Sequence, residues 1–128
     1  MIYGNTFGIK RNTLDELEKL CEKYDKNLFI DRNVLDTIAN LTSRTNREIS
    51  VFISRGGSVV AIGIGDSSTV PLAKLNQKRG DRRFNGVRCI HTHPNGNGKL
   101  SDVDISALKA SRYDCIAAVG VTGGAVKN

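Results

Sequence analysis

The two histidines of this chain, His91 and His93, stand in one tetrapeptide, His91-Thr92-His93-Pro94. On a β-strand, residues two apart point to the same face, so the two imidazoles would project side by side. Pro94 cannot continue a sheet ladder, which places the pair at the end of a strand, before the glycine-containing loop 95–98. A lone histidine is most simply a core residue, but the adjacent pair predicts two ligands of one metal ion.

A serine and an aspartate follow this loop, at the predicted start of a helix. Ser101-x-x-Asp104 is a variant of the capping box, and capping is the simpler interpretation of these two residues alone. If the loop folds the helix start back toward the histidines, Asp104 supplies a third ligand. Two histidines, one carboxylate and a water are the ligands of a catalytic zinc site, although iron, cobalt or manganese suit them too. Cys89 shares the histidines' face and is either a further ligand or, more simply, a buried thiol.

The order H-x-H-P, six residues, then S-x-x-D resembles the JAMM motif of the MPN family of metallopeptidases, which includes deubiquitinating isopeptidases. The motif also has a glutamate on an early strand, and Glu48, 43 residues before His91, aligns with it. The resemblance covers about residues 47–121 and implies an MPN-like fold. It implies that Glu48 is the general base of amide or isopeptide hydrolysis and that Ser101 donates a hydrogen bond to the oxyanion.

Two alternatives accompany this resemblance. On composition alone, the simpler interpretation of Glu48 is an exposed strand residue paired with a lysine. Bacterial RadC proteins carry a similar H-x-H-P-S-G segment, in which Asn95 here replaces the serine. A RadC-like action on DNA therefore stays open, whereas a zinc nucleobase deaminase is excluded because the chain has neither H-x-E nor P-C-x-x-C.

A second resemblance covers nearly the whole chain. The opening MIYGNTFGIK, the stretch NREISVFISRGG and the run RCIHTHPNGNGKLSDVDISALKASRYD are similar to the N-terminal region of clostridial HflX-type GTPases. It implies a GTPase domain after this region and a link to the ribosome. The chain itself contains no G-x-x-x-x-G-K-[ST] phosphate-binding loop, so it is expected to be a piece of a longer protein that hydrolyses no GTP alone.

Composition narrows the other classes of function. The 128 residues are 39% hydrophobic and 25% charged, as in one globular domain. Aromatic residues make up 5%, too few for a stacking surface that binds single-stranded nucleic acid. The net charge is +6, and the basic stretch 74–83 is either a solvated loop or a contact for phosphates or an acidic partner.

Three cysteines without a C-x-x-C pair argue against a disulfide framework and favour free thiols in a reducing cytoplasm. No apolar run approaches the roughly 20 residues that span a bilayer, and the N-terminus has no signal-peptide pattern. A soluble, cytoplasmic protein without a membrane partner is therefore expected.

Hydrophobic periodicity predicts the elements that position the site. A capping box at Thr13 predicts a helix over 14–24, and Asp31 predicts a second over 32–44. Strands are expected at 48–54 and 58–65, joined by a Gly56-Gly57 turn, then at 68–72, 87–93 and, centrally, 113–121, with a helix over 101–111.

This order predicts an α/β fold: a single three-layer domain whose mixed β-sheet is flanked by helices. Its parts are a helical N-terminal part (1–46), a metal-site core (47–121) and a tail or linker (122–128). The predicted function is that of a zinc-dependent peptidase or isopeptidase domain. The alternative is a non-catalytic module that docks or regulates a ribosome-associated GTPase.

Overall fold

The computed structural model describes residues 2–65, 88–94, 98, 115–122 and 125–126. The elements in chain order are β1 (Ile2–Gly4), α1 (Arg11–Glu22), α2 (Arg32–Thr45), β2 (Ile49–Ile53), β3 (Val59–Ile64), β4 (Arg88–His93), β5 (Cys115–Thr122) and β6 (Ala125–Val126). The strands form one mixed sheet of order β1-β3-β2-β4-β5-β6. The predicted α/β class is confirmed.

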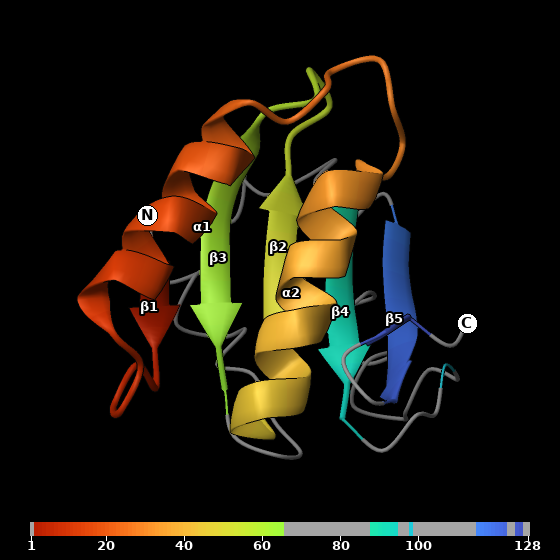
Figure 1. Cartoon of the computed structure of the whole chain (residues 1–128). Helices are drawn as coiled ribbons and strands as arrows, with labels where there is room; N and C mark the ends of the chain where they lie inside the picture. The colour runs from red at the N-terminus through yellow and green to blue at the C-terminus, as the bar shows by residue number, and fades with distance from the viewer. Residues whose placement is uncertain (1, 66–87, 95–97, 99–114, 123–124, 127–128) are drawn as a thin grey trace.

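Both described helices lie on the same face of the sheet, α1 over its β1–β3 side and α2 over β2 and β4 (Figure 1). The described part therefore has two layers. The predicted third layer depends on the helix over 101–111, which lies outside the described residues, as does the predicted strand at 68–72. None of the described helices is long and apolar enough to cross a membrane.

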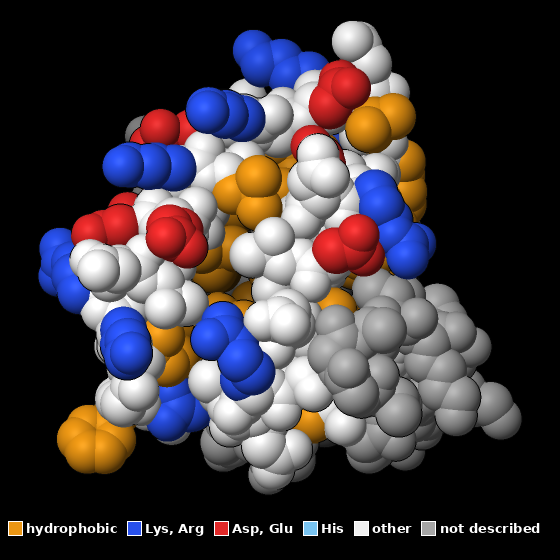
Figure 2. All heavy atoms as spheres, in the orientation of Figure 1, with side chains coloured by type: hydrophobic (Ala, Val, Ile, Leu, Met, Phe, Trp, Pro, Cys, Tyr) orange, Lys and Arg blue, Asp and Glu red, His pale blue; other side chains and the backbone are white. Residues whose placement is uncertain are grey.

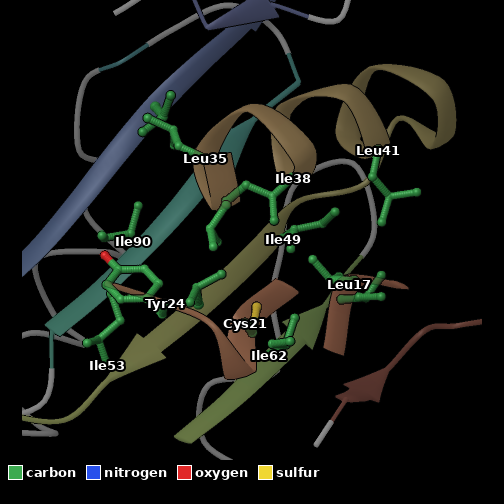
Figure 3. Packing of buried hydrophobic residues seen from close by; sticks show 14 residues of the cluster. Leu17, Cys21, Tyr24, Leu35, Ile38, Leu41, Ile49, Ile53, Ile62 and Ile90 are labelled. Carbon is green, nitrogen blue, oxygen red and sulfur yellow. The ribbon is translucent and has the colours of Figure 1, made fainter. Parts of the chain in front are cut away.

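The core lies between the helices and the sheet (Figure 3). The helices contribute the apolar faces that their 3.6-residue periodicity predicts, and the strands contribute alternate residues. The buried members of this cluster are Leu17, Cys21, Tyr24, Val34, Leu35, Ile38, Leu41, Ile49, Val51, Ile53, Ile62, Ile64, Ile90 and Val119. Because alternate residues point in opposite directions, the intervening strand residues face away from α1 and α2.

α1 begins earlier than its capping box predicts. The amides of Thr13 and Leu14 both donate to the carbonyl of Lys10, which is the N-cap and makes no side-chain cap. The prediction of Thr13 as the cap is wrong because the turn that brings the chain from β1, with Ile9 N–H bonded to Thr6 O, already directs it into the helix. Thr13 is therefore a residue of the first turn.

α2 begins as predicted. The Asp31 carboxylate accepts a hydrogen bond from the amide of Asn33 at 3.0 Å, and its other oxygen accepts one from the amide of Asp25 at 2.9 Å. The same carboxylate thus caps α2 and holds the loop that leads into it. The predicted cap is confirmed.

Two strands at the ends of the chain were not predicted. β1 pairs in parallel with β3, so the N-terminal part, expected to be helical, also contributes a strand to the sheet. β6 lies within the expected tail and pairs with the end of β5. The prediction that β5 is central is wrong, since β2 and β4 occupy the middle of the sheet. β6 pairs with β5 only at Val121 and Thr122, so among the described residues the rest of β5 has β4 as its strand neighbour.

The Gly56-Gly57 turn joins β2 and β3 as predicted, and its two glycines differ. Gly57 has a φ of +90°, and a Cβ there would lie 2.7 Å from the backbone of Lys26. At Gly56 a Cβ would meet only the Ser54 hydroxyl, at 3.8 Å, an ordinary contact. Only Gly57 therefore needs to be glycine.

Replacing Gly57 with alanine should lower the free energy of unfolding by about 1–3 kcal/mol through the strained backbone, and further through the clash with Lys26. Gly56→Ala, the matched control, should change it by less than about 0.5 kcal/mol. Urea denaturation followed by circular dichroism measures both. Equal effects of the two substitutions would contradict this account of the turn.

The helical face carries both signs of charge. Figure 2 shows Lys and Arg interspersed with Asp and Glu over α1 and α2, with hydrophobic side chains in the groove between them. Two i,i+4 ion pairs, Arg11–Asp15 and Arg32–Asp36, contribute to this mixture. The excess positive charge is not gathered on this face, so the face lacks the one-sign patch typical of a phosphate-binding surface. The basic stretch 74–83 lies outside the described residues.

Candidate metal centre

His91 and His93 lie at the end of β4, on the face of the sheet away from α1 and α2. β4 is paired on both sides, with β2 antiparallel and with β5 parallel, which fixes the backbone under both histidines. Their Nε2 atoms are 3.0 Å apart, and the rings meet edge to face with centroids 4.8 Å apart. The strand ends at His93, before Pro94, as predicted.

Glu48 precedes β2 and joins the histidines on this face. Its Oε1 lies 3.7 Å from Nε2 of His93, and its side chain is buried, with a residue exposure of 5%. Its backbone carbonyl accepts a hydrogen bond from the amide of Gly65, which holds it at the end of β3. This burial contradicts the alternative that Glu48 is an exposed strand residue.

The register between β2 and β4 explains this convergence. Ser50 pairs with His91, and the antiparallel ladder ends there. Continued by two residues, the same register sets Glu48 opposite His93. The side chains of two cross-strand pairs, Ser50 with His91 and Glu48 with His93, therefore lie next to each other on one face of the sheet.

The distances suit a small divalent ion. Two atoms bound to a tetrahedral zinc ion at about 2.0–2.1 Å are about 3.3 Å from each other. The separations here are 3.0 Å between the imidazole nitrogens and 3.7 Å between His93 and Glu48. All three donor atoms lie within 4.8 Å of one another. The group of Glu48, His91 and His93 could hold a metal ion.

The polarity of the site also fits a cation. A carboxylate buried to this degree is costly unless it is paired or coordinates a metal. Ser50, at 1% exposure and directly opposite His91, has a hydroxyl without a hydrogen-bond partner in the described part of the chain. A water molecule bound to a metal ion here would give this hydroxyl a hydrogen-bond partner. The residues present therefore fit a hydrated metal ion.

Two of the predicted site residues, Ser101 and Asp104, lie outside the described residues. The prediction of Asp104 as third ligand and of Ser101 as oxyanion donor is untested. Glu48, predicted as the base, stands close enough to the histidines to be a ligand itself. The described part brings together three of the five predicted residues.

Two of the three cysteines, Cys21 and Cys89, are free thiols. Cys21 and Cys89 are buried and form no disulfide. Burial raises the pKa of the Cys21 thiol to about 11, so this residue stays protonated near neutral pH. Cys89 shares the face of the histidines but is not part of the metal-ligand group found among the described residues. The simpler interpretation of Cys89, a buried thiol, agrees with this.

Ser50 was missed by the sequence analysis, although the sequence carries a signal for it. In EISVFIS the apolar residues Ile49, Val51 and Ile53 alternate, so Glu48 and Ser50 share the opposite face. A serine on the same strand face as a candidate base was the signal in the sequence that could have identified Ser50.

Comparisons with protein-family models, with curated proteins and with solved structures find no match to this chain.

Proposed function

We propose that this chain is a metal-binding domain of the JAMM/MPN type and that its centre hydrolyses peptide or isopeptide bonds. The convergence of Glu48, His91 and His93 on one buried point carries this proposal. Zinc is the proposed ion, since two imidazoles and a carboxylate are among its preferred ligands. Asp104 is the proposed third protein ligand, which leaves Glu48 free to act on water.

The roles of the chain's own groups follow from their positions. When bound, the ion supplies a Lewis acid that polarises a carbonyl and makes water more acidic. Glu48, next to His93, accepts a proton from water and later delivers it to the leaving amine. Ser101 is proposed to donate a hydrogen bond to the oxyanion. The two histidines would hold the ion through their ring nitrogens.

A non-catalytic function is the second candidate, and the burial of the site favours it. A catalytic zinc site needs a coordination position that substrate can reach, whereas a structural site does not. His91, Glu48 and His93 are 2%, 5% and 8% exposed. In this case the metal stabilises a module that docks or regulates an HflX-type, ribosome-associated GTPase, the partner that the sequence resemblance implies.

Elemental analysis of protein purified without chelator tests the metal centre itself. We expect one zinc ion per chain, and dialysis against a strong chelator should lower the melting temperature because the ion binds the folded state. Protein that contains no transition metal and gains none on incubation with zinc would contradict both candidate functions. Hydrolysis of peptide and isopeptide substrates by the zinc-loaded protein separates the two.

A further inference from the structure

Thr92, the residue between the two histidines, is part of a buried hydrogen-bond chain on the helical side of the sheet. Its Oγ1 lies 2.6 Å from Oγ1 of Thr42 on α2 and accepts a hydrogen bond from the amide of Ile49 at 3.0 Å. Both threonines are 0% exposed. Buried hydroxyl groups in an apolar interface are costly unless bonded, so each holds the other in place.

These hydrogen bonds lie next to the point where the backbone pairing between β2 and β4 ends. The last backbone pair between β2 and β4 is Ser50 with His91. Glu48 and His93 both lie beyond it, yet their side chains are 3.7 Å apart. The bond from Ile49 N–H to Thr92 Oγ1 is the link between the two strands at the intervening position. Backbone bonds hold His93 to β5 and Glu48 to Gly65 at the end of β3, but the ladder between β2 and β4 does not reach either residue.

We propose that the hydrogen bonds linking Thr42, Thr92 and Ile49 position Glu48 and His93 for metal binding. Through Thr42, α2 then contributes to the geometry of the metal centre. The proposal rests on the proposed metal function. Thr42 is a positioning residue, since it acts through Thr92 and touches no ligand. By reciprocity, whatever holds α2 in place tightens metal binding, and metal binding in turn holds α2 against the sheet.

A pair of substitutions at Thr42 separates the hydroxyl from the packing. Thr42→Val removes the hydroxyl at nearly the same volume, and Thr42→Ser keeps the hydroxyl but removes the methyl group. Titration with cobalt, followed by its ligand-field absorption, measures affinity and geometry together. We expect Thr42→Val to weaken cobalt binding about tenfold, with altered absorption bands, as for other supporting partners of metal ligands. Thr42→Ser should keep the wild-type bands and nearly the wild-type affinity.

The metal-free protein gives a second readout through the ¹⁵N NMR signals of the two imidazoles. Each ring should give one set of signals in the wild type and in Thr42→Ser, and broadened or doubled signals in Thr42→Val. Failure of the wild type to bind cobalt would overturn the metal centre, while the imidazole signals would still test the positioning role. Thr42→Val and Thr42→Ser that agree in affinity, in absorption bands and in imidazole signals would overturn the positioning role alone.

Discussion

Replacing His93 with alanine should abolish stoichiometric metal binding. His93 supplies a nitrogen close to both other donors, 3.0 Å from His91 and 3.7 Å from Glu48. Zinc at 100 times its dissociation constant stabilises a folded protein by about 2.7 kcal/mol, and this increment should vanish in the variant. Elemental analysis and thermal unfolding with and without zinc measure the two effects.

Two further variants serve as controls for this experiment. His93→Gln keeps a polar side chain of similar size, so loss of metal in both variants cannot be attributed to a cavity in the sheet. Cys89→Ala, on the same strand and face, should retain one ion per chain. Retention of zinc by His93→Ala, or loss of it in Cys89→Ala alone, would show that the ligand set is wrong.

Local periodicity was sufficient to predict α1, α2 and the strands from β2 to β5. The apolar positions of α2 and the alternation of Ile49, Val51 and Ile53 depend only on which face is buried. Predictions failed where a non-local contact decides. β1 is three residues long, too short for any periodicity, and forms because β3 offers it a parallel edge. The start of α1 follows from the turn after β1, so its local capping signal was misleading.

The site was predictable in the same partial way. The two-residue spacing of His91 and His93 was sufficient to predict their shared face. The place of Glu48 opposite His93 depends on the register between β2 and β4, and neither strand contains that information by itself. The resemblance to the JAMM motif supplied Glu48 instead. The role of Thr92 could not be predicted from the sequence, because its hydrogen-bond partner, Thr42, is 50 residues away on another element.

The two faces of β4 have different roles: one carries the candidate metal ligands, and the other packs against the helices. On one face the histidines meet Glu48, and on the other Ile90 lies in the hydrophobic core and Thr92 bonds to α2. A strand that presents ligands on one side and is anchored on the other holds its ligands with little freedom. Such rigidity serves a catalytic centre and a structural one equally, so the distinction between them depends on Glu48.

Replacing Glu48 with glutamine should preserve the metal and abolish turnover if the centre is catalytic. The amide keeps the size and polarity of the buried side chain but cannot take a proton from water. Loss of a general base typically lowers the rate about 10²–10⁴-fold. Zinc-loaded wild type and variant would be compared on fluorogenic peptide and isopeptide substrates, with metal content measured on the same samples.

The same pair of measurements distinguishes three roles for Glu48. Full metal content with lost hydrolysis identifies a base, and the third ligand must then come from elsewhere in the chain, as proposed for Asp104. Loss of metal identifies Glu48 as a ligand, in keeping with donor atoms that lie within 4.8 Å of one another. Full metal content with unchanged hydrolysis removes Glu48 from the mechanism. A wild type that binds zinc and cleaves none of the substrates favours the non-catalytic module, in which the carboxylate balances the charge of a buried ion.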